Sequence, residues 1–150
     1  MKVLVQRSLK SNVVIDGKIN GQINKGLVLL VGFTYGDTEK EIDELINKVI
    51  NLRIFDDQNG VMNKSLLDIK GSILSISQFT LYADTKKGRR PSYINALNPL
   101  EATKLYDIFN KKLMDLNIHT ETGIFGSDMK VNISNDGPIT IILESKWYCV

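Results

Sequence analysis

The segment GLVLLVGFTY, residues 26–35, is an almost unbroken run of apolar residues that ends in a threonine and a tyrosine. It is far shorter than the ~20 apolar residues that a membrane helix needs. A strand that is apolar on both sides of its pleat is typically buried on both faces of a sheet. We therefore expect this segment to form a buried strand, with the rest of the chain packed around it.

Strands precede this segment and a helix follows it. KVLVQR, residues 2–7, alternates between apolar and polar residues, and VVIDGKI, residues 13–19, contains Asp16-Gly17, a strong signal for a β-hairpin. On the other side, Thr38 and Glu41 have the spacing of a helix capping box. Apolar residues then recur at helical intervals, which predicts a helix with one face on the sheet: Ile42, Leu45, Ile46, Val49 and Ile50.

The second half of the chain also predicts strands together with one long helix. A turn cluster at 56–60 predicts a short hairpin, SILSISQFTLYA at 72–83 a strand, and Asn98 with Pro99 the start of a second helix that ends near Asn117. Three further strands are expected in IHTET, MKVNIS and ITIILES, the last two joined through NDGP at 135–138. The prediction is one α+β domain, residues 1–150, with a largely antiparallel sheet and two main helices.

Composition excludes several classes of function. The formal net charge of +2 is too small to make the whole surface a polyanion binder, and cationic residues gather strongly in one place only: Lys86, Lys87, Arg89 and Arg90. The single cysteine, Cys149, cannot form an internal disulfide, and His119 is the only histidine. We expect no metal site, no cofactor, no membrane segment and a reducing cytoplasmic location.

The usual catalytic residues are missing. His119 begins a predicted strand with no nucleophile motif nearby, so a structural or surface role is expected, and Cys149 is expected to be a small apolar filler. SQFTL, residues 77–81, is the remaining candidate, because on a strand Ser77, Phe79 and Leu81 would face one way and Gln78 and Thr80 the other. The alternative is that Ser77 and Thr80 are ordinary strand hydroxyls bonded to neighbours.

Two further features have alternative interpretations. The basic run 86–90 is either a solvated turn or, with Tyr82 and Tyr93 nearby, a nucleic-acid contact. Pro138 stands between two strand-like runs and must lie at a turn, a bulge or a sheet edge, because it cannot donate to a ladder. The residues alone favour an ordinary turn with a trans bond before Pro138.

The motifs SQFTL, GRRPS and NDGPIT together resemble the D-aminoacyl-tRNA deacylases, formerly called D-tyrosyl-tRNA deacylases. The similarity covers essentially the whole chain, because other segments follow in the family's order and spacing: VQR, GLVLLVG, RIFDD, GVMN, TGIFGSDM and VNISNDGPIT. The resemblance implies a barrel-like sheet and a homodimeric enzyme with active sites at the subunit interface. It would hydrolyse the ester between a D-amino acid, or mischarged glycine, and the 3′-terminal adenosine of tRNA, as a chirality proofreader in translation.

The resemblance also implies roles for individual residues. Gly137-Pro138 matches the family's Gly-cisPro motif, which enters the other subunit's active site and rejects L-amino acids by a clash with its carbonyl groups, and Arg7 braces that motif. The family's pocket corresponds to Ser77, Gln78, Phe79 and Thr80, with Phe79 near the terminal adenine. Phe125 and Met129 match the segment beside the pocket, with core packing as the alternative. Phosphate contacts are expected from Lys86, Lys87, Arg89 and Arg90.

Three hypotheses follow for the activity. The first is the deacylase, in which either Thr80 or the tRNA's own terminal 2′-hydroxyl carries the chemistry; we favour the 2′-hydroxyl because no residue is an evident base for Thr80. The second is a dimeric RNA-binding module without turnover. The third is an esterase for small D-amino acid esters that needs no tRNA.

Overall fold

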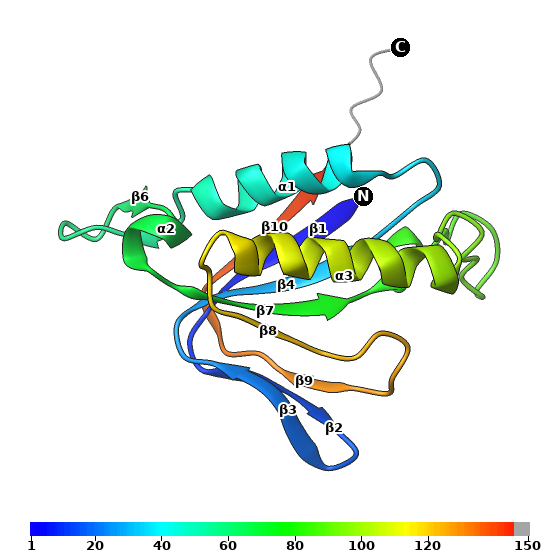
Figure 1. Cartoon of the computed structure of the whole chain (residues 1–150), viewed down its shortest axis with the longest axis horizontal. Coiled ribbons are helices and arrows are strands. Elements are labelled where there is room, and N and C mark those ends of the chain that lie inside the picture. Colours follow the sequence, from blue (N-terminus) through cyan, green and yellow to red (C-terminus); the bar gives the residue numbers. More distant parts are fainter. Residues whose placement is uncertain (146–150) are drawn as a thin grey trace.

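The computed structural model of the protein describes residues 1–145, and the expectation for Cys149 lies outside these residues. The strands of the main sheet follow the order β10-β1-β4-β7-β8 (Figure 1). The predicted buried strand is β4 (Gly26–Gly32), and it lies in the centre. Its neighbours are β1 (Lys2–Ser8), β7 (Ser72–Ser77), β8 (Thr120–Thr122) and β10 (Asn135–Glu144).

Two long helices cover one face of the main sheet (Figure 1). Helix α1 (Glu39–Asn51) begins with the predicted capping box of Thr38 and Glu41. Helix α3 (Pro99–Asp115) begins with Pro99 after the cap Asn98, whose side chain accepts a hydrogen bond from the Glu101 N–H. The helices bury their apolar residues against alternate residues of β1, β4 and β7, among them Val3, Leu29 and Ile73. Both predicted helices are confirmed.

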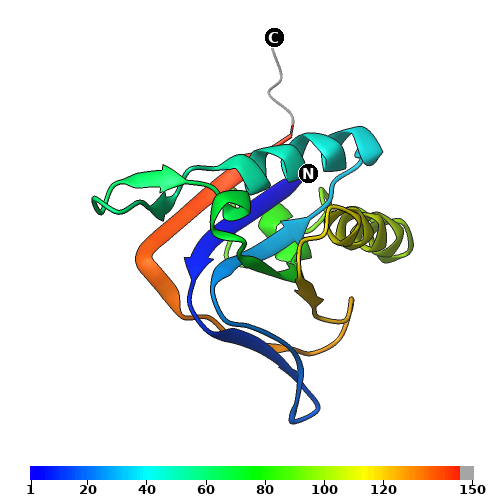
Figure 2. The same ribbon diagram turned by 60° about the vertical axis from the view of Figure 1, so that its left-hand side comes forward.

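A three-stranded antiparallel sheet lies on the opposite side of the main sheet from the helices (Figure 2). It has the order β3-β2-β9, with β2 (Ser11–Ile15), β3 (Lys18–Ile23) and β9 (Lys130–Asn132). A second core fills the space between the two sheets: Val13, Ile23, Val28, Leu74 and Ile76. Successive side chains of β4 therefore pack alternately in the first core, under the helices, and in the second core, between the sheets. This is why the sequence of β4 is apolar throughout.

The α+β class is confirmed, with two differences in detail. The main sheet is mixed, because β7 runs parallel to both β4 and β8, whereas the other pairs are antiparallel. Parallel neighbours need long crossover connections, and the two long helices lie in these connections. The barrel implied by the resemblance is not closed: within residues 1–145 the strands form three separate sheets.

The small elements between α1 and β7 were predicted only in part. The hairpin of β5 (Phe55–Asp56) and β6 (Met62–Lys64) is confirmed. Helix α2 (Leu66–Ile69) was missed, although Ser65 and Asp68 form a capping box at its start. The Ser65 N–H and hydroxyl bind the Asp68 carboxylate and hold its pKa below the ordinary value. A helix of one turn is too short to show an apolar period, so the capping spacing was its only signal.

The expected hairpin between the last two strands is wrong. β9 pairs with β2 in the small sheet, whereas β10 pairs with β1 at the edge of the main sheet. The NDGP segment therefore belongs to β10 rather than to a turn. It forms a bulge, because Gln6 pairs with Thr140 whereas Ser8 pairs with Asn135. Of the three places considered for Pro138, the structure has a bulge in an edge strand, so the ordinary turn with a trans bond that the residues alone favoured is wrong. The Gly137–Pro138 bond is cis, as the resemblance implied.

Candidate active site

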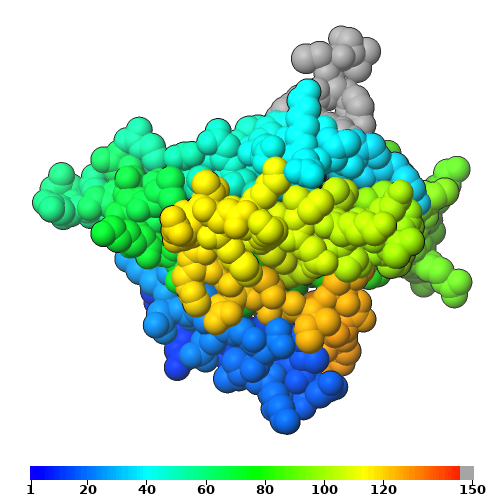
Figure 3. Space-filling model, in the orientation of Figure 1, coloured from blue at the N-terminus to red at the C-terminus, as the bar shows by residue number. Residues whose placement is uncertain are grey.

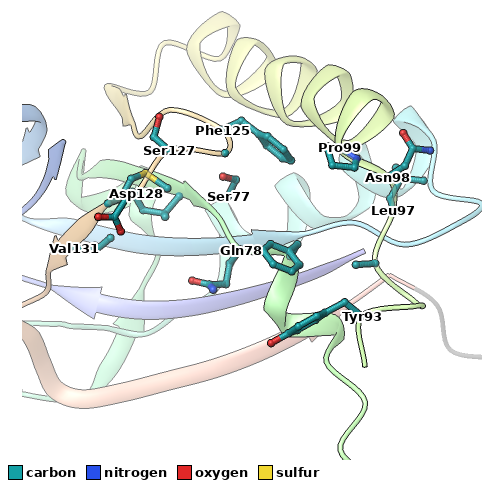
Figure 4. A pocket seen from close by; sticks show the side chains of 15 residues that line it. Ser77, Gln78, Tyr93, Leu97, Asn98, Pro99, Phe125, Ser127, Asp128 and Val131 are labelled. Carbon is teal, nitrogen blue, oxygen red and sulfur yellow. The ribbon is translucent and has the colours of Figure 1, made fainter. Parts of the chain in front are cut away.

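A pocket of about 590 Å³ opens where β7 ends (Figure 4). Its walls come from three places: the end of β7 and the turn after it, the start of α3, and the loop between β8 and β9. In the close view Ser77 and Phe125 lie in the middle, Ser127 and Asp128 on one side, and Asn98 and Pro99 on the other. The pocket combines apolar walls with a few polar groups, which is the usual makeup of a small-molecule site.

The strand that delivers Ser77 stops earlier than predicted. Residues Phe79–Tyr82 form a 3₁₀ turn, η1, so the expected alternation of side chains beyond Ser77 is wrong. The last ladder bond is from the Gln78 N–H to the Val31 carbonyl at 2.7 Å. Gly32 permits the change of direction, because a β-carbon there would lie 2.9 Å from the Gln78 carbonyl oxygen.

This turn brings three of the four predicted strand residues to the pocket. Ser77, Gln78 and Phe79 line it, and Phe79 is 53% exposed. Thr80 does not line it; its hydroxyl accepts a hydrogen bond from the Gln78 side-chain amide. No acid or base within residues 1–145 forms a hydrogen bond with Ser77 or Thr80, so neither hydroxyl has a partner that would activate it.

The turn η1 also offers backbone N–H groups as hydrogen-bond donors, and the sequence alone does not show that these groups are free. The N–H groups at the start of a short helix have no acceptor inside that helix. Phe79 and Thr80 hold these positions, and none of the backbone hydrogen bonds between elements of residues 1–145 uses their N–H groups. Ser77 and the Phe79 N–H are therefore available to a ligand at one end of the pocket, whereas Thr80 is not among the residues that line it.

The loop carrying Phe125 and Met129 is held by a buried tyrosine. The Ser75 carbonyl of β7 accepts hydrogen bonds from the Tyr106 hydroxyl at 2.7 Å and from the Gly123 N–H at 3.2 Å. Burial raises the pKa of Tyr106, so this hydroxyl stays protonated and remains a donor. The Tyr106 ring also contacts Phe125, with 6.2 Å between ring centroids. Phe125 and Met129 line the pocket, and each also packs against one of the two cores, so the expected core packing is present. Contact with a substrate stays a prediction.

The basic run lies outside the pocket. The segment 84–92 is a loop closed at its base by two backbone hydrogen bonds between Asp84 and Ser92, of 2.8 and 2.9 Å. It lies at the right-hand edge of the molecule in the orientation of Figures 1 and 3. The four cationic residues at its tip are all exposed, and none forms an ion pair with the described residues: Lys86, Lys87, Arg89 and Arg90.

Arg7 lies beside the Gly137-Pro138 bulge. It is only 8% exposed, and its guanidinium donates to the Ile54 carbonyl at 2.9 Å and to the Asp136 carbonyl at 3.2 Å. The Asp136 and Asp56 carboxylates lie 3.2 and 3.4 Å from it. A β-carbon on Gly137 would lie 3.2 Å from the Arg7 Nη2 atom. Arg7 thus joins β1, β5 and β10 and packs against the bulge.

The structure does not bring Gly137 and Pro138 to the pocket of their own chain. Both residues are exposed, and neither lines it. His119 is also outside; its exposed imidazole lies 3.6 Å from the Glu121 carboxylate. Residues 1–145 contain no cluster of three or more His, Cys, Asp or Glu that could hold a metal ion. In the same range no helix is long and apolar enough to cross a membrane.

The other pocket residues were not predicted as parts of a pocket: Ile76, Tyr93, Ala96, Leu97, Asn98, Pro99, Gly126, Ser127, Asp128 and Val131. Asn98 and Pro99 were identified only as a helix start. They reach the pocket because the start of α3 lies near the end of β7 (Figure 1), and only the tertiary structure shows this arrangement. Tyr93 had one signal, an aromatic residue close to a basic run.

Comparison with known proteins shows which family the chain resembles over nearly its whole length. The family model described as D-Tyr-tRNA(Tyr) deacylase matches residues 4–144. The D-aminoacyl-tRNA deacylase of Bacillus cytotoxicus is 54% identical over 146 residues, which are 97% of this chain and 100% of the relative. The protein of the same name from Bacillus cereus strain B4264 is 53% identical over the same shares of both chains.

Two solved structures have the same fold. One, named c-Myc DNA Unwinding Element Binding Protein, has a TM-score of 0.92 and 36% identity, and the alignment covers 98% of this chain and 100% of the other. The second, described as a probable eukaryotic D-amino acid tRNA deacylase, has a TM-score of 0.82 and 15% identity, with coverage of 95% and 97%. At 15% identity the second likeness concerns the fold alone.

The fold, the pocket and these matches define the class of protein, a deacylase enzyme of the hydrolase type. Within that class, the chain belongs to the D-Tyr-tRNA(Tyr) deacylase family.

Proposed function

We propose that this protein hydrolyses the ester between a D-amino acid and the 3′-terminal adenosine of tRNA, and that it rejects the L-enantiomer with Gly137-Pro138 of a second subunit. The observation that carries the proposal is the pocket at the end of β7, which presents Ser77, Gln78 and Phe79 in a chain that matches the deacylase family over residues 4–144. Aminoacyl-tRNA is a cytoplasmic substrate, so we place the protein there.

Transition-state stabilisation is assigned to the turn η1. The tetrahedral intermediate of ester hydrolysis carries negative charge on the former carbonyl oxygen. The Phe79 N–H stands at the start of the turn, in the pocket lining, without an acceptor in its own helix, and one such donor is typically worth a factor of ~100 to 1,000 in rate. An aminoacyl ester is already reactive, so orientation of a water molecule and stabilisation of this charge can suffice for hydrolysis.

The terminal 2′-hydroxyl of the tRNA supplies the remaining group in this proposal. Neither Ser77 nor Thr80 is bonded to an acid or base of the described residues, and Thr80 already accepts a hydrogen bond from Gln78. A vicinal hydroxyl of the substrate lies next to the ester in every productive complex. It can position the attacking water without any help from a protein base.

Selection of the D-enantiomer is assigned to the bulge in β10. The backbone of Gly137 and Pro138 is exposed, and Arg7 packs against it from inside the same chain. Placed beside the α-carbon of the substrate, this backbone would collide with an L side chain, whereas a D side chain would point away. Specificity would thus come from a built-in clash with the wrong substrate. Glycine has no side chain, so glycyl-tRNA is expected as a secondary substrate.

A homodimer would bring the bulge to the pocket. Gly137 and Pro138 do not line the pocket of their own chain, so the wall must come from another copy. A row of apolar side chains runs across β10, β1 and β4, formed by the register partners Ile142, Leu4 and Leu30. Ile142 is 60% exposed, because the small sheet covers only the β4 and β7 side of this face. We assign this row to the contact between two copies.

The tRNA body would be held by the basic loop. Its four cations project from the molecule without acidic partners among the described residues, as phosphate contacts require. They lie close in sequence to Phe79, the residue assigned to the terminal adenine. The loop therefore suits the phosphates of the acceptor stem.

The test compares three substrates at catalytic protein concentration. D-tyrosyl-tRNA should be hydrolysed rapidly, and the same tRNA ending in 2′-deoxyadenosine, charged at the 3′ position, should be hydrolysed far more slowly. D-tyrosine methyl ester should be a poor substrate, because it lacks the adenosine. Equal rates for the ribose and deoxyribose ends would remove the 2′-hydroxyl from the mechanism, and rapid cleavage of the methyl ester would favour a small-ester esterase.

The second candidate is a nucleic-acid-binding module without turnover. It is favoured by the missing protein base and by the solved structure at 36% identity, whose name describes binding to a DNA element. This candidate predicts that the protein binds tRNA while D-tyrosyl-tRNA decays no faster than in buffer.

A further inference from the structure

Tyr93 is an exposed aromatic residue that the proposed mechanism does not use. It lines the pocket together with Phe79 and lies at the border of the pocket (Figure 4). The Tyr93 ring is 40% exposed, and it belongs to neither hydrophobic core. Large aromatic side chains contribute most to stability when they are buried, so its position is better explained by a ligand than by packing.

Tyr93 and Phe79 form one continuous aromatic surface. Their ring centroids are 5.0 Å apart, and the ring planes meet at 67°, edge against face. In an edge-to-face pair, the ring that contributes its edge has both of its flat faces free of the other ring. With 53% of Phe79 and 40% of Tyr93 exposed, the surface can offer a flat face to more than one planar group.

Tyr93 also stands at the base of the basic loop. It directly follows Ser92, whose backbone hydrogen bonds to Asp84 close the loop 84–92. The order from the pocket outward is thus the ester site at Ser77, the ring of Phe79, the ring of Tyr93 and then the exposed cations of residues 86–90. Aromatic rings that lead into a basic surface are the usual makeup of a binding track for single-stranded nucleic acid.

We propose that Tyr93 forms a second base subsite, which stacks the base of the penultimate nucleotide of the tRNA while Phe79 meets the terminal adenine. The inference rests on the proposed function, because it takes the aminoacylated 3′ end as the ligand. The unpaired 3′ end of a tRNA is single-stranded, so its bases are free to stack on aromatic side chains. Stacking is tolerant of sequence, and it explains why a flat ring rather than a hydrogen-bonding group stands at this position.

The test uses substrates that differ by one nucleotide. The value of kcat/KM is measured for the D-tyrosyl ester of adenosine and for the D-tyrosyl ester of the dinucleotide cytidylyl-adenosine, and their ratio reports the contribution of the second nucleotide. The native protein should prefer the dinucleotide. Tyr93→Leu should lower this ratio about ten-fold, whereas Tyr93→Phe should keep it, because stacking needs the ring and not the hydroxyl.

A matched control is Tyr35→Leu, which removes another exposed tyrosine, 57% exposed and not among the residues that line the pocket. It should leave the ratio unaltered. The proposal is overturned if Tyr93→Leu keeps the native ratio, or if it lowers kcat/KM for both esters in the same proportion, because Tyr93 would then only support Phe79.

A failure of the proposed function gives a different result. In that case the native protein would not hydrolyse D-tyrosyl-tRNA at all, and Tyr93 is tested by binding alone. The affinity for tRNA that lacks only its terminal adenosine is compared with the affinity for tRNA that lacks its two terminal nucleotides, so that the two ligands differ by the penultimate nucleotide alone. Tyr93→Leu should abolish the difference between the two; a difference that persists in the variant would overturn the subsite.

Discussion

For individual residues, the proposed mechanism depends on backbone positions more than on reactive side chains. Gly137 has a φ of +121°, which side-chain-bearing residues rarely adopt, and an added β-carbon would lie 2.9 Å from Cγ1 of Ile139. Thr80, the side chain that looks most like a nucleophile, turns away from the pocket lining to accept a hydrogen bond from Gln78. Substitutions at these two positions separate the proposed mechanism from a nucleophilic one.

Gly137→Ala should reduce either the rate with D-tyrosyl-tRNA or the discrimination against the L-ester, since the bulge must shift to accommodate the methyl group. Backbone strain of this kind typically costs ~1–3 kcal/mol, which is enough to change kcat/KM by about ten-fold or more. Both enantiomeric esters are assayed. Gly60→Ala is the control, because Gly60 also has a positive φ, +74°, but no atom lies within 4 Å of its added carbon. Unaltered kinetics with both esters would remove Gly137 from the site.

Thr80→Ala should retain most of the activity, because the proposed catalysis does not use the Thr80 hydroxyl. A decrease of less than about ten-fold in kcat/KM is expected, corresponding to one neutral hydrogen bond with Gln78. Thermal unfolding of the variant checks that the fold is preserved. Complete absence of turnover in a folded Thr80→Ala protein would restore Thr80 as the nucleophile.

Among the helices and strands, the sequence predicted the regular elements but missed where a strand ends and which strands pair. The apolar run of β4, the capping box of α1 and the Asn98-Pro99 start of α3 were all confirmed, since each rests on local spacing. The end of β7 at Ser77 was missed, because it is set by the close approach of Gly32 to the Gln78 carbonyl, and these residues are far apart in sequence. The pairing of β9 and β10 with different sheets was missed for the same reason.

The sequence predicted the part of the candidate site that comes from the end of β7. It did not predict the parts that other elements contribute. Ser77, Gln78 and Phe79 were predicted and line the pocket. Asn98 and Ser127 line it as well, but a sequence carries no mark of which loop faces which helix. The separation of Gly137 from the pocket of its own chain likewise depends on the tertiary structure, and it is this separation that argues for a second subunit.

The basic loop makes a prediction at the same scale. Replacing Lys86, Lys87, Arg89 and Arg90 with alanine should weaken tRNA binding, most strongly at low salt. The slope of log affinity against log salt concentration should become shallower by about 0.7 to 0.9 for each phosphate that the variant no longer binds. Alanine at the exposed Lys18 and Lys104 provides the control. An unchanged affinity at every salt concentration would show that the loop does not bind phosphates.

At the scale of the whole molecule, the account needs two copies of the chain. The pocket with Ser77 and the bulge with Gly137 are separate in one copy, and the apolar row of Ile142, Leu4 and Leu30 runs across β10, which also carries the bulge. A contact through this row would place a bulge from each copy against the other copy. Two complete sites would then form together or not at all.

Ile142→Lys should therefore give a monomer that lacks deacylase activity, although every residue of its own pocket is intact. A lysine in the middle of an apolar contact would have to be desolvated without a partner, which is costly. Sedimentation velocity measures the state of association, and D-tyrosyl-tRNA deacylation the activity. Ile19→Lys is the control, because Ile19 is 58% exposed on the small sheet. A monomeric Ile142→Lys protein with native activity would show that one chain holds a complete site.

Chirality-selective hydrolysis can be tested by measuring the deacylation rates of D-tyrosyl-tRNA and L-tyrosyl-tRNA side by side with catalytic amounts of the native protein. The account predicts rapid hydrolysis of the D-ester and no hydrolysis of the L-ester beyond its decay in buffer. Equal rates for the two esters would contradict the wall of Gly137 and Pro138, and hydrolysis of neither ester would contradict the deacylase itself.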